Sequence, residues 1–119
     1  MTIYILDDDE LELGMWEYCI HRNAPEYFCQ TFTSADKFKE AVELFPPKIA
    51  IIDFIIPFTD GTEICKWMRD KYPDVKVFVN TSLVGEEYKI LAERCSAVYL
   101  SKELKFEERL EVVANGCKS

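Results

Sequence analysis

The 119-residue chain is 49% hydrophobic and has a formal net charge of −8, which predicts one folded domain with a buried core and argues against disorder. The negative charge argues against direct nucleic-acid binding, because neutralising phosphates requires clustered Lys and Arg. Apolar runs far shorter than a bilayer, and an N-terminus without signal-peptide features, argue against a membrane or secreted protein, so we expect a cytoplasmic one.

Strand-like apolar runs alternate with segments of helical periodicity from the start of the chain. The first run, 3–6, ends in an acidic turn, and a helical pattern follows. The apolar positions of that helix are Leu11, Met15, Tyr18 and Cys19. A short second strand, 27–32, leads to an N-cap at Thr33-Ser34. The next helix ends before Pro46-Pro47 and has four apolar residues on one face, Phe38, Ala41, Val42 and Phe45.

The second half of the chain continues the alternation. A third strand, 48–53, is followed by a helix that opens at Gly61-Thr62, and its inner residues are Ile64, Cys65 and Met68. A fourth strand, 75–79, precedes a helix over 86–93 with Tyr88, Leu91 and Ala92 as apolar residues. A fifth strand, 97–100, precedes a last helix with Phe106, Leu110 and Val113. Five successive strand–helix units predict a parallel sheet covered on both faces, with right-handed crossovers.

The cysteines and the single histidine offer no site of their own. The five cysteines are Cys19, Cys29, Cys65, Cys95 and Cys117. Because none forms a Cys-x-x-Cys pair and the count is odd, we expect free, mostly buried thiols in a reducing compartment. His21 has no second histidine to complete a metal site, so we expect it to be a solvated residue at a helix end.

Polar residues fall where the predicted strands end. Asp7 and Asp8 follow the first strand, Asp53 ends the third, Thr81 the fourth and Lys102 the fifth. The carboxyl ends of parallel strands lie on one edge of the sheet, where open α/β sheets bind their ligands. Each residue alone has an ordinary explanation as a helix cap, turn residue or surface lysine. Their placement on four different strands predicts a shared site.

The residue types at this edge favour phosphoryl chemistry. Three clustered carboxylates repel one another, so we expect them to bind a cation or take up a proton. Carboxylates, a backbone carbonyl and water form the hard octahedral site that Mg²⁺ prefers. An Asp carboxylate can attack phosphorus, and phosphoryl transfer depends mainly on positioning and charge neutralisation. Mg²⁺, the Lys102 ammonium and the Thr81 hydroxyl would supply these.

Over nearly its whole length the chain resembles the CheY-like receiver domain of two-component response regulators. The matching residues, in order and spacing, are Asp7-Asp8, Asp53-x-x-x-Pro57-x-x-Asp60-Gly61, Thr81-Ser82 and Tyr99-Leu100-Ser101-Lys102. The resemblance implies a single receiver domain over 1–119. The implied fold is a flavodoxin-like, doubly wound (βα)5 sandwich with a five-stranded parallel sheet in the order 2-1-3-4-5.

The resemblance also implies roles for the acidic residues. Asp53 would be the phosphoacceptor. Mg²⁺ would be bound by Asp8, by Asp53 and by the backbone carbonyl of Ile55, with Asp7 acting through a water molecule. These roles describe a signalling switch rather than an enzyme, with at most slow self-catalysed phosphorylation and dephosphorylation.

For the other side of the site, the resemblance implies that Thr81 and Lys102 bind the phosphoryl group and that Tyr99 is the switch aromatic. The implied phosphodonor is a histidine kinase or a phosphotransfer protein. A downstream protein target, or an output domain outside this chain, would respond, and the resemblance allows a dimer that forms on phosphorylation. No nucleic acid or membrane is expected as a direct partner.

One departure from the family pattern and two variable positions beside the site lead to further expectations. Glu103 stands where the family usually has Pro, so a cis peptide after Lys102 is less expected, because non-proline cis bonds cost about 3 kcal/mol. Ile55 and Leu83 flank the expected phosphoryl position and are both apolar. We expect them to hinder an attacking water and to slow self-dephosphorylation.

Two other functions stay open at this stage. Residues 6–10 superficially resemble the Asp-x-Asp opening of haloacid dehalogenase-type phosphatases, but that interpretation leaves Asp53 and the proline block unexplained. A phosphate-independent binding module would use only the surface, and would neither bind Mg²⁺ nor respond to a phosphoryl analogue. The sequence also does not separate a stand-alone regulator from a receiver within a longer protein.

Overall fold

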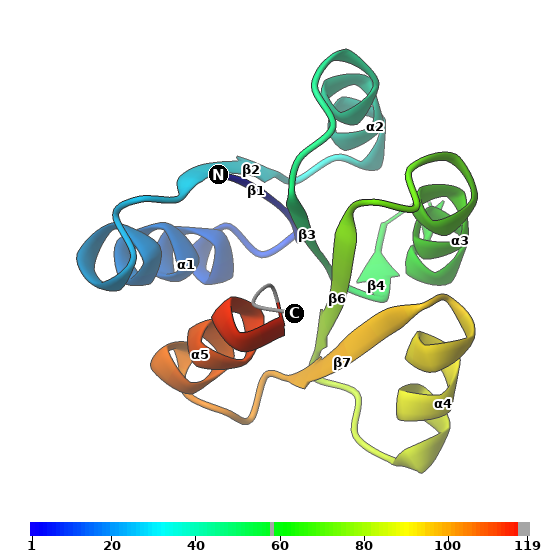
Figure 1. The fold of residues 1–119 in the computed structure, drawn as a ribbon. Coiled ribbons are helices and arrows are strands. Elements are labelled where there is room, and N and C mark those ends of the chain that lie inside the picture. The colour runs from blue at the N-terminus through cyan, green and yellow to red at the C-terminus, as the bar shows by residue number, and fades with distance from the viewer. Residues whose placement is uncertain (58, 117–119) are drawn as a thin grey trace.

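The fold is a five-stranded parallel sheet with helices on both faces (Figure 1). The computed structural model describes residues 1–57 and 59–116. The strands of the sheet are β1 (Thr2–Leu6), β2 (Phe28–Phe32), β3 (Ile49–Ile52), β6 (Lys76–Thr81) and β7 (Ala97–Ser101). They lie in the order β2-β1-β3-β6-β7. Counted within this sheet alone, that is the predicted order 2-1-3-4-5, which is confirmed.

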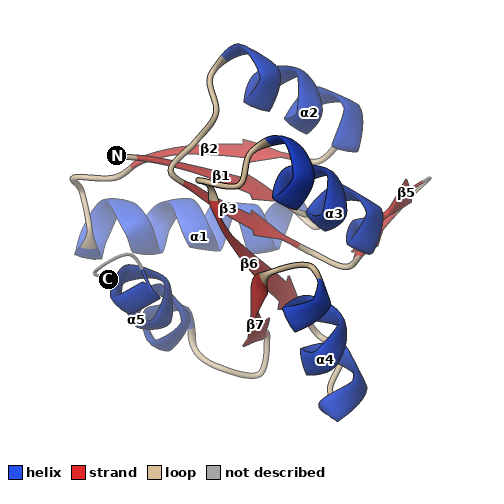
Figure 2. Cartoon of the chain, turned by 45° about the vertical axis from the view of Figure 1, so that its right-hand side comes forward, coloured by secondary structure: helices blue, strands red, loops and turns tan. Residues whose placement is uncertain are grey.

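The helices form two layers, one on each side of the sheet (Figure 2). They are α1 (Glu10–Asn23), α2 (Ala35–Leu44), α3 (Gly61–Lys71), α4 (Glu86–Arg94) and α5 (Phe106–Gly116). One hydrophobic cluster contains residues of α1 and α5, and the other contains residues of α2, α3 and α4. The doubly wound arrangement predicted from the alternating pattern is therefore confirmed.

The central strand β3 explains why the run before Asp53 is apolar throughout. It lies between β1 and β6, and all four of its residues are fully buried. Side chains of a strand point alternately to opposite faces, so a strand covered on both faces needs apolar residues at every position. After Asp53 the chain forms a small hairpin that the sequence did not predict, made of β4 (Ile55–Ile56) and β5 (Thr59–Asp60).

Most of the apolar positions noted in the first helix do not face the core. Leu11, Met15 and Tyr18 are exposed. The buried residues of α1 are Leu13, Trp16, Cys19 and Ile20. Both sets have helical spacing, and docking against the sheet selects the set that contains the larger Trp16. Phe45, predicted to share one face with Phe38, Ala41 and Val42, instead follows α2 as its C-cap and is 76% exposed.

Free, mostly buried cysteines and an exposed histidine at a helix end are confirmed among the residues that the structure describes. Cys19, Cys65 and Cys95 are free and buried, and Cys29 is free and partly buried; Cys117 lies outside the described residues. Burial raises the pKa of the Cys65 thiol to about 12, so this thiol stays protonated at neutral pH. His21 is exposed in the last turn of α1.

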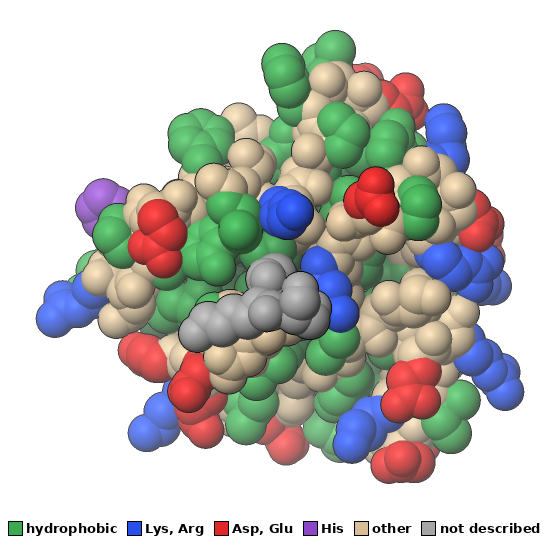
Figure 3. Space-filling view, in the orientation of Figure 1, with side chains coloured by type: hydrophobic (Ala, Val, Ile, Leu, Met, Phe, Trp, Pro, Cys, Tyr) green, Lys and Arg blue, Asp and Glu red, His purple; other side chains and the backbone are tan. Residues whose placement is uncertain are grey.

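The surface carries charges of both signs, and the site edge lies opposite to the start of the first strand. Figure 3 shows acidic and basic side chains interspersed on the face drawn there. No helix among residues 1–57 and 59–116 is long and apolar enough to cross a bilayer. The first strand begins, and the last helix ends, on the side of the sheet opposite to the carboxyl ends of the strands (Figure 2). A polar site at those carboxyl ends therefore lies far from the start of the first strand and from the end of the last helix.

Candidate functional site

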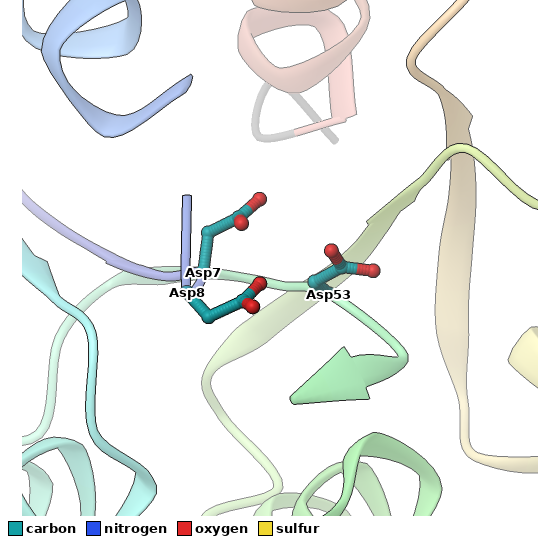
Figure 4. A group of neighbouring side chains, drawn as sticks. All are labelled: Asp7, Asp8 and Asp53. Atoms are coloured by element: carbon teal, nitrogen blue, oxygen red, sulfur yellow. The ribbon is translucent and has the colours of Figure 1, made fainter. Parts of the chain in front are cut away.

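Three carboxylates meet at the carboxyl edge of the sheet (Figure 4). Asp7 and Asp8 follow β1, and Asp53 follows β3, which pairs with β1. One oxygen from each lies within 4.8 Å of the others. Asp7 and Asp53 are 1% and 5% exposed, whereas Asp8 is open to solvent. The predicted convergence of these acids is therefore present in the structure.

A single lysine contacts both buried carboxylates. Lys102, directly after β7, places its Nζ 2.8 Å from Asp7 Oδ2 and 2.9 Å from Asp53 Oδ2. Its backbone amide donates to the carbonyl of Thr81 at 2.9 Å, which fixes it beside the end of β6. Three carboxylates thus face one ammonium group, and the site keeps a surplus of negative charge.

Burial and ion pairing act in opposite directions on these groups. Burial raises the pKa of Asp7, while the contacts with Lys102 and with the Asp9 amide lower it, and the net shift is upward. For Lys102, burial lowers the pKa, but hydrogen bonds to Asp7 and Asp53 raise it more, so its pKa lies above the ordinary value. Lys102 is therefore a fixed positive charge at neutral pH.

Backbone groups hold the two buried acids in place. Asp7 Oδ1 accepts a hydrogen bond from the Asp9 amide at 2.9 Å, and Asp53 Oδ1 accepts one from the Ile55 amide at 3.2 Å. The Asp9 carboxylate instead caps α1, which removes the second acid of the Asp-x-Asp motif considered for a phosphatase. The Ile55 side chain is exposed, at the start of β4.

The loop after Asp53 needs a glycine at position 61. A Cβ atom there would lie 2.4 Å from the Asp53 carbonyl oxygen and 2.5 Å from the Cα of Phe54. The Gly61 amide donates to the Phe54 carbonyl at 3.1 Å. The start of α3 therefore packs directly on the backbone that carries Asp53, which explains the Asp60-Gly61 step in the sequence.

Thr81 and Tyr99 contact the same loop residue. Thr81, fully buried at the end of β6, accepts a hydrogen bond from the Leu83 amide at 3.2 Å. The Tyr99 hydroxyl of β7 donates to the Leu83 carbonyl at 2.6 Å. The two residues expected to act together in switching are thus linked through one peptide segment, and Leu83 itself is partly buried.

The donor set fits a hard divalent cation. Mg²⁺ prefers carboxylate and carbonyl oxygens, and Asp7, Asp8 and Asp53 bring such oxygens together beside a single compensating lysine.

The described chain has no cis peptide bond, so the peptide between Lys102 and Glu103 is trans, as expected without a proline.

A second buried polar cluster beside the site was not predicted. It consists of Glu12, Asn80 and Arg109, from α1, β6 and α5. Two signals for it exist in the sequence. Asn80 directly follows the apolar run 77–79, and Arg109 has helical spacing with Phe106 and Val113, which were expected to face inward.

Comparison with known proteins identifies related sequences. A model of the response regulator receiver domain family matches residues 3–114. The DNA-binding transcriptional regulator NtrC of Proteus hauseri is 24% identical over 113 residues, and the sensory transduction protein LytT of Oceanobacillus iheyensis is 23% identical over 114 residues. The matches cover 94% and 95% of this chain but 24% and 46% of those proteins. The chain thus spans less than half the length of these two relatives.

Solved structures share the fold at low sequence identity. The BeF3-activated receiver domain of DrrB, a Thermotoga maritima protein, is 21% identical with a TM-score of 0.88, covering 99% of this chain and 97% of that one. The signal receiver domain of a DNA-binding response regulator from Colwellia psychrerythraea is 15% identical with a TM-score of 0.90, covering 100% and 99%. These similarities establish the fold independently of sequence.

Proposed function

This chain belongs to the response regulator receiver domain family, and we propose that its Asp53 accepts a phosphoryl group whose presence switches a partner-binding surface. The observation that carries the proposal is Lys102, which contacts Asp53 and Asp7 at once beside the third carboxylate of Asp8. Receiver domains are signalling domains of two-component systems that partner with histidine kinases. We propose a histidine kinase or a phosphotransfer protein as the phosphodonor.

The transfer we propose is a direct displacement at phosphorus. A carboxylate oxygen of Asp53 attacks the phosphorus of a phosphohistidine, and the bond between phosphorus and the imidazole nitrogen breaks. The electron pair of that bond returns to the imidazole ring. We propose that Lys102, which is 2.9 Å from Asp53, pairs with the phosphoryl oxygens, and that the Thr81 hydroxyl donates a hydrogen bond to them.

Receiver domains bind Mg²⁺ at an acidic pocket, and the residues proposed to hold it here are Asp8, Asp53 and the Ile55 carbonyl, with Asp7 acting through water. When bound, the ion would neutralise charge on the phosphoryl oxygens. The surplus of carboxylates over lysine at the site supports this assignment. Asp7, nearly fully buried and paired with Lys102, fits an indirect role better than the exposed Asp8 does.

We propose that the signal leaves the site through Leu83. Thr81 cannot turn toward a phosphoryl group and keep its contact with the Leu83 amide unchanged. A shift of Leu83 would weaken its carbonyl contact with the Tyr99 hydroxyl, and Tyr99 would turn inward. The surface built from α4, β7 and α5 would then change shape and alter its affinity for a downstream target, an output domain or a second copy.

Acetyl phosphate with Mg²⁺ tests the phosphoacceptor. Intact mass spectrometry should show a gain of one phosphoryl group in the wild-type protein and none in Asp53→Asn. Asp74→Asn, at an exposed turn outside the site, is the matched control and should gain mass as the wild type does. A folded wild-type protein that gains no mass with Mg²⁺ present would contradict the assignment, and would favour a phosphate-independent binding module.

A further inference from the structure

A buried guanidinium group connects three elements next to the site. Arg109 of α5 is 2% exposed. Its Nη1 donates to Glu12 Oε2 at 2.8 Å and to Asn80 Oδ1 at 2.9 Å. The Asn80 amide group donates to the same Glu12 oxygen at 2.8 Å, which closes a three-residue ring of hydrogen bonds. The guanidinium also lies over the rings of Phe106 and Trp16, 4.0 and 5.3 Å from their centres.

Stability alone does not account for these buried charges. Removing an ion pair from water costs as much as its attraction returns, and replacing such a group with apolar residues of similar volume is often neutral or stabilising. The surroundings of the guanidinium include the apolar rings of Trp16 and Phe106. A cluster of this kind is better explained by the geometry that it imposes on the segments it joins.

One branch of contacts leads from Glu12 to the phosphoacceptor. The Glu12 amide contacts Asp9 Oδ1 at 3.4 Å, and the Asp9 amide donates to Asp7 Oδ1 at 2.9 Å. Asp7 then shares Lys102 with Asp53. Each step joins groups in direct contact, so the position of the Glu12 side chain bears on the turn that carries the acidic pair.

The other branch leads through Asn80 to the opposite side of the site. Asn80 directly precedes Thr81 in β6, and their side chains point to opposite faces of the sheet. Asn80 is held by Arg109 on the α5 side. The Thr81 carbonyl accepts a hydrogen bond from the Lys102 amide at 2.9 Å. Fixing Asn80 therefore fixes the strand end that places both Thr81 and Lys102.

We propose that Arg109, together with Glu12 and Asn80, is a positioning residue for the phosphoryl and Mg²⁺ site. It sets the distance between the start of α1, which follows the acidic pair, and the end of β6, which carries Thr81. Because such coupling is reciprocal, binding at the acidic edge shifts the packing of α5 against Trp16. This inference rests on the proposed function of Asp53.

Asn80→Leu and Arg109→Met test the positioning role. Asn80→Leu keeps the volume and leaves the pair of Arg109 with Glu12, so it should fold even if Arg109→Met does not. Mg²⁺ affinity by calorimetry, and the rate of phosphate uptake from acetyl phosphate, should each fall by about tenfold, the lower end of the loss seen when residues that orient metal ligands are removed. Arg109→Lys, which keeps the charge, should restore part of both.

Val42→Ala is the matched control, because it loses buried volume on the opposite face of the sheet. It should lower thermal stability but leave both site measurements unchanged. In a Trp67→Phe background, Mg²⁺ with beryllofluoride should also change the fluorescence of Trp16, and Asn80→Leu should reduce that change.

Phosphate uptake by the wild-type protein distinguishes a failure of the positioning role from a failure of the proposed function. If it takes up no phosphate, the function proposed for Asp53 is wrong. If the wild type takes up phosphate while Asn80→Leu matches it in Mg²⁺ affinity and uptake rate, the positioning role alone is overturned. An equal loss of Mg²⁺ affinity in Val42→Ala would likewise overturn it, because a general loss of stability would then explain the effect.

Discussion

Among the residues that the structure describes, charge is buried in two neighbouring places that differ in balance. At the acidic edge, three carboxylates share the single ammonium of Lys102. Between α1, β6 and α5, one carboxylate, Glu12, meets one guanidinium, Arg109, and Asn80 bonds to both. The first cluster carries surplus negative charge and the second is neutral as a whole.

The difference indicates what each cluster is for. A balanced cluster whose members bond to one another has little to gain from an added ion, so it serves the structure around it. An unbalanced cluster open on one side, through Asp8, is stabilised by a cation or a proton. The site that binds and the element that positions it can therefore be told apart by charge balance.

Breaking the balanced cluster should have the largest effect on stability. Arg109→Met leaves the largely buried Glu12, whose side chain is 11% exposed, without its partner, and we expect the free energy of unfolding to fall by about 3 kcal/mol, the lower end for a broken buried pair. Urea denaturation measures this loss. The triple variant Glu12→Leu, Asn80→Leu, Arg109→Met should recover most of it, because no buried charge is left. If Arg109→Met alone is as stable as the wild type, the Glu12 carboxylate must reach water when Arg109 is absent.

Balancing the acidic edge with an ion should have the next largest effect. Mg²⁺ at about 100 times its dissociation constant should raise the free energy of unfolding by about 2.7 kcal/mol. Thermal unfolding at fixed ionic strength measures the gain, with sodium chloride as the control. Asp53→Asn should show a much smaller gain. Equal melting temperatures with and without Mg²⁺ in the wild type would mean that the carboxylates do not bind the ion.

The exposed side of the acidic edge can be tested by the rate at which phosphate is lost from Asp53. Ile55 is 53% exposed, and its backbone amide donates to Asp53, so we expect its side chain to hinder water that approaches a phosphoryl group on Asp53. We expect Ile55→Asn to speed the loss of phosphate about tenfold, equivalent to a lowering of the barrier by 1.4 kcal/mol. A time course of intact mass measures it. Ile90→Asn, on α4 and similarly exposed, should leave the rate unchanged; equal rates in all three proteins would contradict the shielding.

The smallest effect should come from removing one surplus charge. Burial raises the pKa of Asp7 in the folded protein, so the folded state binds a proton more tightly than the unfolded chain. Stability then falls as the pH rises from the ordinary pKa of Asp through the raised one, and ionised Asp7 is destabilising above it. Asp7→Asn should therefore stabilise the Mg²⁺-free protein at pH 7 by about 1 kcal/mol, the size of an ordinary point substitution.

Two measurements check that expectation for Asp7. Urea denaturation without Mg²⁺ should show the gain at pH 7 and a smaller one as the pH is lowered, because the raised pKa means that more of the wild-type Asp7 is then protonated. Lys102 still pairs with Asp53 in the variant, so folding should be retained. A variant less stable than the wild type at pH 7 would show that the ion pair of Asp7 with Lys102 outweighs its burial.

The acidic edge was predictable because its signals are local. The buried run before Asp53 identifies a central strand, and a polar residue at the carboxyl end of such a strand lies at the edge where open α/β sheets bind ligands. The same reasoning placed Asp7 and Lys102, since each directly follows its own strand. The geometry of parallel strands then brings the three together without any knowledge of helix packing.

The balanced cluster was missed because its contacts are distant in sequence. Arg109 bonds to residues 97 and 29 positions away, and a charged residue is ordinarily assigned to the surface. The buried face of α1 also depends on contacts that are distant in sequence. Leu11 and Trp16 lie on different stripes of helical spacing, and only docking of α1 on the sheet decides which stripe is buried.

The direction of the chain has a practical consequence. The amino ends of the strands, where the first strand begins and the last helix ends, lie on the side opposite to Asp53. The six residues of β6 span about 20 Å at the usual rise per residue. A sensor chip or fluorescent label attached beside Thr2 or Gly116 would therefore sit a full strand length from the phosphoacceptor. The protein can be immobilised by that side with its acidic edge facing a kinase in solution.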